Sequence, residues 1–245
     1  MDSGELAIPN YLARTYWWAY VHPRAIRLFE RQWLVNLILW GNFARLRDHA
    51  IDALGGRLDG RTLQIACVYG DLTARLAGRI PRGAGLDVVD VLPLQLQNLS
   101  RKLSSSPEAA TLICGDSAAL RAADASYDRA LLFFLLHEQP AEVRRRTLAE
   151  AMRVVKPGGR IVVVDYHRPH ALHPLRLPMR AILGTLEPYA LDLWRHELAH
   201  WLPPERALSA MTKRTFFGGL YQLLTFTRGE SPELPPQASV IPESA

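Results

Sequence analysis

Residues 62–90 read TLQIACVYGDLTARLAGRIPRGAGLDVVD, and this stretch decides the fold. Its two ends, 62–68 and 83–90, are apolar runs typical of buried strands, and residues 73–80 between them have the apolar spacing of a helix. Strands joined through a helix pair in parallel, since a parallel connection needs a crossover of this length. The stretch therefore predicts the first unit of an α/β sheet.

The alternation of strands and helices continues after residue 90. Further strands are predicted at 110–116, 128–134 and 160–166, helices at 92–103 and 141–155, and two late strands within 214–228 that join at Gly218 and Gly219. The turn KPGG (156–159) opens the fifth strand, and residues 171–211, which prolines punctuate, read as a helical insert. The pattern predicts a mostly parallel sheet with helices on both faces.

The region before the sheet is helical in pattern. Residues 9–54 read as two or three helices with an apolar stripe at spacings of three and four: Ile26, Phe29, Trp33, Leu37, Trp40 and Phe43. Trp17 and Trp18 also fall here, and arginines are interleaved with the aromatic residues. Two interpretations are open. The region is either a helical cap over the sheet edge, or an interfacial element with aromatics among lipid headgroups and arginines on anionic lipid.

The length and composition are those of one globular domain. The chain has 245 residues, of which 49% are hydrophobic. We divide this single domain (1–245) into a helical N-terminal cap (1–58), an α/β core (59–228) and a disordered tail (229–245) rich in Pro, Ser and Glu. The net charge of +5 comes almost entirely from arginine, and no lysine-rich tract or RNA-binding motif is visible, so we expect no nucleic-acid partner.

Three features favour a cytoplasmic location. The first residues, MDSGELAIPN, are acidic and polar, unlike a secretory signal. The longest apolar run, residues 33–40, is far shorter than the ~20 residues that span a bilayer. Cys67 and Cys114 lie in apolar, strand-like segments, and we expect both to be reduced core residues.

Four segments, in order along the chain, resemble the class I S-adenosylmethionine-dependent methyltransferases. They are DVVDVLPLQLQNLSRKL (87–103), CGDS (114–117), SYDRALLFFLLHE (126–138) and VVKPGGRIVVVD (154–165). The resemblance covers roughly residues 60–228. It implies a class I methyltransferase-like (Rossmann-like) α/β fold with a helical N-terminal cap and a helical insert before the last strands, and S-adenosyl-L-methionine as cofactor.

The same resemblance assigns residues to the cofactor. Asp90, which ends the second strand, would accept hydrogen bonds from the ribose hydroxyls, with Asp87 as the competing candidate. Asp116 would accept from the adenine amine, and Ser117 would offer its backbone N–H to the ring. The other implied contacts lie at the ends of the first, second and fourth strands: Gln64, Ala66, Tyr69, Gly70, Val91 and Phe133.

A narrower resemblance is visible in RTYWWAYVHPRAIRLFERQWLVNLILWGNF (14–43) and VYGDLT (68–73), which are similar to the rhodoquinone biosynthesis proteins. These relatives of the ubiquinone-pathway methyltransferases replace a ring methoxy group of ubiquinone with an amino group. S-adenosylmethionine is their amino donor, and they require manganese. The resemblance implies this reaction, ubiquinone or a related membrane quinone as partner, and peripheral attachment to the inner face of the cytoplasmic membrane. The oligomeric state is left open.

The first loop departs from the methyltransferase pattern. Relatives carry glycines spaced as GxGxG, which let the backbone approach the cofactor, whereas the same positions here hold Ala66, Val68 and Gly70. Either the loop holds the cofactor more loosely, or Val68, Tyr69 and Asp71 turn its amine toward the quinone. Two alternatives to amination stand: a C- or O-methyltransferase acting on a quinone or lipid-like precursor, and a non-catalytic cofactor-binding scaffold of a quinone-synthesis complex.

Amination needs a base, because a protonated amine is no nucleophile, and a polarised quinone carbonyl, which a divalent cation can supply. Ligands bind at the carboxyl ends of strands in open α/β sheets. The candidate catalytic residues at these ends are Tyr69, Asp71, His137, Tyr166 and His167. Manganese prefers carboxylate and water oxygens, with imidazole as a further ligand, and the sequence does not identify its ligands.

One motif is a formal match to a zinc-protease helix: His196-Glu197-x-x-His200 in the insert. No obvious third ligand follows it, and Pro203 and Pro204 end the segment at once. We therefore interpret it as a helix of a substrate-covering insert.

Overall fold

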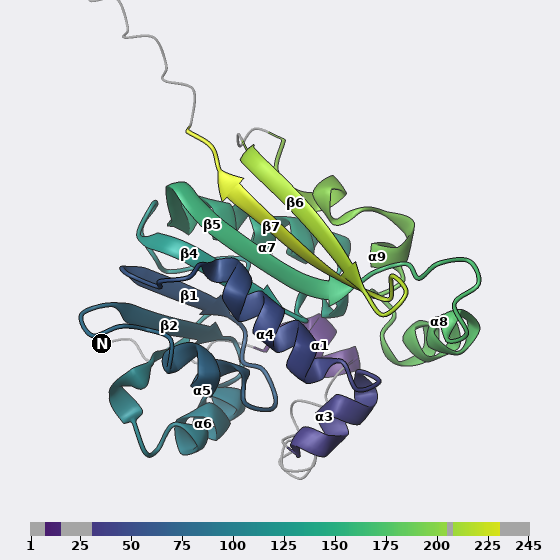
Figure 1. Ribbon diagram of the computed structural model, residues 1–245, viewed down its shortest axis with the longest axis horizontal. Helices are drawn as coiled ribbons and strands as arrows, with labels where there is room; N and C mark the ends of the chain where they lie inside the picture. The colour runs from purple at the N-terminus through teal and green to yellow at the C-terminus, as the bar shows by residue number, and fades with distance from the viewer. Residues whose placement is uncertain (1–7, 16–30, 205–207, 231–245) are drawn as a thin grey trace, which may run out of the picture.

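The computed structural model describes residues 8–15, 31–204 and 208–230, which form a seven-stranded sheet with helices on both faces (Figure 1). The strands are β1 (Arg61–Ile65), β2 (Gly85–Asp90), β3 (Thr111–Cys114), β4 (Tyr127–Phe133), β5 (Val155–Tyr166), β6 (Leu208–Phe216) and β7 (Tyr221–Arg228). Their order in space is β3-β2-β1-β4-β5-β7-β6. The first five run parallel, whereas β7 pairs antiparallel with β5 and β6 antiparallel with β7. The predicted mostly parallel sheet is confirmed.

Helices pack on both faces of this sheet. They are α1 (Asn10–Thr15), α3 (Gln32–Ile38), α4 (Phe43–Leu54), α5 (Leu72–Ala77), α6 (Pro93–Lys102), α7 (Ala141–Val154), α8 (Arg176–Leu186) and α9 (Asp192–Arg195). Helix α4 crosses one face, and α7 lies on the other (Figure 1). Short 3-10 turns at Pro107–Ala109 (η2), Leu136–Glu138 (η3) and Leu198–Trp201 (η4) complete the described elements.

The apolar composition of β5 follows from burial on both faces. Val162 and Val164 pack into the cluster that contains α4, while Ile161 and Val163 pack into the cluster that contains α7. All four side chains are fully inaccessible to solvent. Each such burial contributes about 1.5–3 kcal/mol, which is why a central parallel strand reads as a continuous apolar run.

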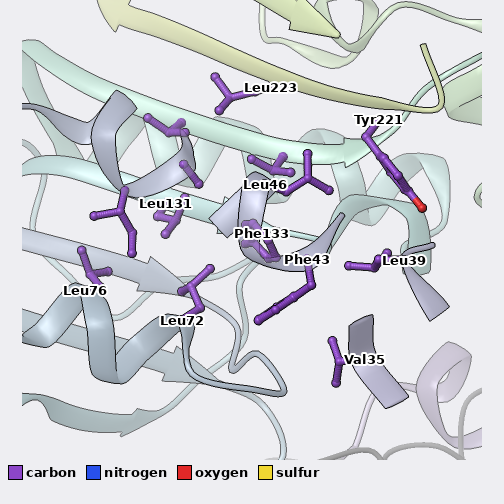
Figure 2. Close-up of a cluster of buried hydrophobic side chains, with 14 of the residues drawn as sticks. Val35, Leu39, Phe43, Leu46, Leu72, Leu76, Leu131, Phe133, Tyr221 and Leu223 are labelled. Carbon is purple, nitrogen blue, oxygen red and sulfur yellow. The ribbon is translucent and has the colours of Figure 1, made fainter. Parts of the chain in front are cut away.

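Phe43, the first residue of α4, joins the sheet to the helices above it. Its ring meets that of Phe133 edge-on, with 6.1 Å between centroids. Figure 2 shows Phe43 in a buried cluster that runs from Leu131 on β4 to Val35 and Leu39 near α3. The N-terminal cap is therefore anchored to the sheet through α4.

The expected apolar stripe of the cap is not one helical face. The chain turns between α3 and α4, where Trp40 and Gly41 both have positive φ (51° and 77°). As a result Trp33 and Leu37 are 59% and 62% exposed, whereas Phe43 is buried. Ile26, Phe29, Trp17, Trp18 and residues 231–245 of the expected tail lie outside the described residues.

Two expected boundaries are wrong. KPGG does not precede the fifth strand but lies inside β5, where the pairing with β4 shifts register between Tyr127 and Arg129. The insert also ends earlier than residue 211, because β6 begins at Leu208. Short-range patterns do not show these boundaries, since pairing with a distant strand decides them.

The cysteines and the histidine motif also differ from expectation. Neither cysteine forms a disulfide; Cys114 is exposed on the edge strand β3, contrary to expectation, whereas Cys67 is half-buried and packs against the core. The segment around His196 is not an α-helix: α9 ends at Arg195, and a 3-10 turn follows at Leu198. Within the described residues no helix has the length and hydropathy needed to cross a membrane.

A substitution at Gly159 tests how tightly the irregular part of β5, residues 156–159, packs. A Cβ at this position would lie 2.8 Å from the carbonyl oxygens of Asp128 and Lys156, and backbone atoms cannot move aside cheaply. We expect Gly159→Ala to lower the free energy of unfolding by about 1–3 kcal/mol in urea titrations. Gly85→Ala is the matched control, because a Cβ on Gly85 meets nothing within 4 Å. Equal midpoints for both variants would contradict this packing.

Candidate functional site

A cavity of about 680 Å³ opens where the parallel strands end. Its floor is formed by residues at the carboxyl ends of β1, β2, β3, β4 and β5, and its walls by α1, α3 and α8. The carboxyl edge of an open α/β sheet is where ligands bind, because crossover connections leave a crevice there. Most of the predicted site residues line this cavity: Ala66, Tyr69, Asp90, Val91, Asp116, Ser117, Phe133, His137 and Tyr166.

Asp90 ties two strand ends together at the cavity floor. Its carboxylate accepts hydrogen bonds from the backbone N–H groups of Cys67 (2.7 Å) and Leu92 (2.8 Å). Burial raises the pKa of Asp90, and these two backbone donors oppose the shift. A carboxylate has about four acceptor positions, so Asp90 retains capacity for ligand hydroxyls.

The competing aspartate does not face the cavity. Asp87 accepts a hydrogen bond from the Tyr127 hydroxyl at 2.8 Å and pairs with Arg61 at 2.5 Å. It lines none of the cavity. Of the two acids that the sequence left open, only Asp90 is in position to meet a ligand.

The polar end of the cavity continues to β3 and α1. Asp116 caps the following turn by accepting from the backbone N–H of Ala118 at 2.8 Å. Ser117 accepts from the side-chain amide of Gln139 at 3.0 Å. Tyr11 of α1 also lines this end, and its pKa is raised by burial and by the nearby carboxylates of Glu138 and Asp116. Sequence analysis missed Tyr11, because nothing in a short helix signals a distant cavity.

The first loop keeps the backbone of a glycine loop although it has lost glycines. Ala66 has a φ of 75° and Gly70 a φ of 82°, both in the left-handed region that favours glycine. A Cβ on Gly70 would lie 2.8 Å from the Phe43 ring. Such strain in a non-glycine residue concentrates at functional sites, so the conformation of Ala66 is consistent with a loop that contacts a ligand.

Helix α6 holds this loop in place. Lys102 donates from Nζ to the carbonyl oxygens of Val68 (3.0 Å) and Gly70 (2.9 Å). Gln95 donates to the Tyr69 hydroxyl at 2.8 Å, which fixes the phenol in the cavity wall. The loop is thus positioned by side-chain donors from α6 in addition to its own backbone.

Four predicted site residues do not line the cavity: Gln64, Gly70, Asp71 and His167. Gln64 is fully buried and donates to the carbonyl of Ala66 at 2.9 Å. Asp71 pairs with Arg47 and Arg75, each at 2.6 Å; burial opposes ionisation, but these partners lower the pKa of Asp71. Such pairing keeps Asp71 from acting as a base toward a ligand.

His167 does not line the cavity and is held by other contacts. Its Nδ1 is 2.8 Å from the carbonyl oxygen of Gly219, and its Nε2 is 2.9 Å from Nζ of Lys213. Lys213 also pairs with Glu197 of the histidine motif. These contacts link β5, β6 and the insert, so in this structure His167 holds parts of the fold together and does not reach the cavity.

His137 and Tyr166 form an aromatic corner of the cavity, with their rings edge-on at 4.9 Å. His137 Nδ1 is 2.9 Å from Oδ1 of Asp165, a fully buried carboxylate that sequence analysis did not single out. Burial alone would lower the pKa of His137, but Asp165 raises it to about 9. Burial and neighbouring Tyr221 raise the pKa of Tyr166, so its phenol stays neutral.

The other half of the cavity is an apolar arm between α3 and α8. The Trp40 indole N–H donates to the Met179 sulfur at 3.2 Å and joins the two helices. The residues of the arm are Leu34, Val35, Leu37, Ile38, Leu39, Trp40, Met179, Ile182, Leu183 and Leu186. The cavity can therefore hold a ligand with a polar head and a long hydrocarbon part.

The described residues do not fit a manganese site. Within 8–15, 31–204 and 208–230, no three His, Cys, Asp or Glu side chains lie in positions to hold a metal ion. In the zinc-protease-like motif, the rings of His196 and His200 stack at 4.6 Å.

Comparison with known proteins supports the methyltransferase resemblance. A family model described as a methyltransferase domain matches residues 62–159. The chain is 33% identical over 134 residues to the demethylmenaquinone methyltransferase of Renibacterium salmoninarum, a match that covers 55% of this chain and 53% of that protein. It is 32% identical over 151 residues to the ubiquinone/menaquinone biosynthesis C-methyltransferase UbiE of Paracoccus denitrificans, covering 60% and 58%. The chain thus spans little more than half the length of these curated relatives.

A solved structure extends the likeness to the fold. The N-methyltransferase NodS from Bradyrhizobium japonicum WM9, in complex with S-adenosyl-L-homocysteine, matches with a TM-score of 0.59 at 13% identity. The match covers 85% of this chain and 98% of NodS. The chain therefore has the class I methyltransferase-like fold that the ordered segments predict.

Proposed function

We propose that this chain is an S-adenosylmethionine-dependent enzyme that exchanges a ring methoxy group of ubiquinone for an amino group and so forms rhodoquinone. The observation that carries the proposal is a single cavity that joins a polar end to an apolar arm. The polar end suits a nucleoside cofactor, and the arm suits the polyprenyl tail of a quinone. The relatives named for quinone pathways support the choice of substrate.

The residues that line the polar end suit the cofactor. Asp90 would accept from the ribose hydroxyls, Asp116 from the adenine amine, and Phe133 would contact the base. When bound, S-adenosylmethionine would supply the nitrogen of its amine, which replaces a methoxy group that leaves as methanol and is released from the cofactor by cleavage of its Cα–N bond, or, in the alternative reaction, its methyl group. Neutral Tyr166 can donate a hydrogen bond, and Tyr69 restricts the space beside the loop.

Two observations bear on which group is transferred. The loop that departs from GxGxG supports amination, because Ala66 and Tyr69 change the surface that the amino-acid end of the cofactor meets. The printed names of the relatives instead favour methylation of a quinone precursor, which is the second candidate. A binding scaffold is the third. Because the described residues form no manganese site, no step is assigned to a metal.

Isotope transfer separates these candidates. Incubated with ubiquinone, manganese and S-adenosylmethionine that carries ¹⁵N in its amino group, the protein is expected to place ¹⁵N in the quinone, as measured by mass spectrometry. Methyl transfer to a quinone precursor without nitrogen label would instead establish the ordinary reaction. Cofactor binding without either product would support the scaffold.

Cofactor binding is tested with a pair of aspartates. We expect Asp90→Asn to weaken the binding of S-adenosyl-L-homocysteine about 10- to 100-fold in calorimetric titrations, because a charged acceptor for hydroxyls is lost. Asp87→Asn is the control: it removes a partner of Arg61 and Tyr127 outside the cavity and should lower stability while leaving affinity unchanged. If Asp87→Asn weakens binding and Asp90→Asn does not, the assignment is wrong.

The mouth of the apolar arm supports the proposed membrane attachment. Large apolar side chains in and next to the two helices that flank the arm are exposed: Trp33, Leu37, Ile38 and Trp40 in or after α3, and Leu172, Leu177, Ile182 and Leu186 before or in α8. Neither helix contains an acidic residue, and α8 carries Arg176 and Arg180. Apolar side chains beside arginines suit a bilayer with anionic lipids, from which the tail of the quinone would enter the arm directly.

Vesicle sedimentation tests this attachment. The protein should pellet with phosphatidylcholine vesicles that contain phosphatidylglycerol, and less so in high salt. A double variant, Trp33→Glu and Leu177→Glu, changes exposed residues outside the cavity wall and should weaken binding at least about tenfold. Met211→Glu changes an exposed apolar residue of β6 and is the control.

The same variants separate attachment from catalysis. The double variant should keep its activity on a short-tailed, water-soluble quinone and lose it on quinone in vesicles. Equal sedimentation of the double variant and Met211→Glu would refute a docking role for the mouth.

A further inference from the structure

His137 is held in the cavity wall by a carboxylate that is itself immobile. Asp165 is fully buried and accepts from three backbone N–H groups, those of Leu136 (2.9 Å), His137 (3.2 Å) and Tyr166 (2.7 Å). Its Oδ1 also lies 2.9 Å from Nδ1 of the His137 ring. Because these contacts fix the carboxylate, they hold its negative charge beside this ring nitrogen.

The imidazole ring is restricted on its other sides as well. Phe134 and Tyr166 pack edge-on against it, with centroid distances of 5.9 and 4.9 Å. The remaining ring nitrogen, Nε2, lies 3.8 Å from Oε1 of Glu138, which is too long for a hydrogen bond. With Nδ1 beside Asp165, Nε2 is the remaining ring nitrogen of a residue that lines the cavity.

We propose that His137 acts as a protonated imidazole that donates a hydrogen bond from Nε2 to a carbonyl oxygen of the bound quinone, with Asp165 as its positioning residue. This inference rests on the proposed function and assigns the group that polarises the quinone. It gives His137 the role of a hydrogen-bond donor.

The charges around the ring support this protonation state. The groups that face it are Asp165 on β5, Glu138 in η3 and Glu187 after α8, and all three carboxylates raise the pKa of His137. Tyr166 is the other titratable neighbour in contact, and burial keeps it neutral. Burial of His137 opposes the carboxylates, and the resulting pKa is about 9. The ring is therefore charged at neutral pH and loses its proton as the pH rises through about 9.

The two candidate reactions make opposite demands on such a donor. When an amine adds to a quinone ring, an electron pair moves onto the carbonyl oxygen, and a cationic donor stabilises that charge. The oxygen regains its double bond when methanol leaves, so His137 keeps its proton while the nitrogen becomes bonded to the ring. The amino group is freed when the Cα–N bond of the cofactor breaks: Cα loses its proton, the electron pair reduces the quinone to the quinol, and water hydrolyses the resulting imine to a 2-keto acid and the aminoquinol. The quinone itself is the oxidant, and no electrons are exchanged with the protein. Methylation instead draws electrons away from a ring oxygen, so the same donor would hinder it. A protonated His137 thus favours amination.

Nuclear magnetic resonance of the full chain with labelled histidine tests the protonation state without turnover. One imidazole, identified by its absence from His137→Gln, should remain doubly protonated at neutral pH and titrate at about 9. His49 is the internal contrast, because burial and Arg214 lower its pKa. A neutral His137 ring at neutral pH would overturn the inference.

Infrared spectroscopy tests the contact with substrate. With S-adenosyl-L-homocysteine present, the carbonyl band of a bound short-tailed ubiquinone should lie at lower frequency than the band of the same quinone in water-free solvent. His137→Gln should remove this shift. The same variant should reduce kcat about 100- to 1000-fold with little change in KM. An unchanged band or an unchanged kcat would refute the role of His137.

Asp165→Asn examines the positioning residue. The variant should bring the titration of His137 down by at least one pH unit and shift the fall of kcat at high pH in parallel. If this variant does not fold, the titration and infrared band of the unaltered protein decide the question. A shifted carbonyl band without ¹⁵N transfer would refute amination but leave the donor role of His137 intact. Transfer of ¹⁵N by a protein with a neutral His137 would support amination and refute the donor role.

Discussion

Where the central strands end, several backbone N–H groups have no partner on a neighbouring strand. Two buried aspartates, Asp90 and Asp165, accept hydrogen bonds from these groups. Asp90 accepts from the residues that follow β1 and β2, and Asp165 accepts from the residues that follow β4 and end β5. An unpaired buried N–H costs about 1–3 kcal/mol, so these carboxylates stabilise the very edge at which the cavity opens. Of these two acids, Asp90 lines the cavity itself, whereas Asp165 lies beside His137, which lines it.

This arrangement gives the cavity its two-sided character. Carboxylates gather at one end because parallel strands bring their carboxyl ends to one edge. The other end is apolar because α3 and α8 are not part of the sheet and contribute only side chains, such as Trp40 and Met179. A head that makes hydrogen bonds and a tail that does not can therefore occupy the same cavity, which is the chemistry of a cofactor meeting a polyprenyl quinone.

The candidate site could be predicted in part from the sequence. Asp90 and Asp116 were assigned from the resemblance to the methyltransferases, and His137 from its place near a strand end; all three line the cavity, because the carboxyl ends of parallel strands converge. Asp71 also follows a strand, but its carboxylate pairs with Arg47 of α4, 24 positions earlier in the chain. His167 contacts Lys213 of β6 and does not line the cavity. Tyr11 was missed for the converse reason, since its position depends on where the N-terminal cap packs. Ion pairs and packing between distant segments leave no local signal.

The amino-acid sequence by itself determined the parallel sheet and the edge at which a ligand binds, because strand and helix periodicity are local and the crossover rule fixes how they combine. It also showed that the loop after β1 lacks two of the three glycines of the GxGxG pattern. Only the tertiary structure decided that Ala66 keeps the backbone of a glycine, that KPGG bulges within β5, and that Asp165 lies against His137. These features arise from contacts between strands far apart in the chain, and burial at those contacts sets both conformation and charge.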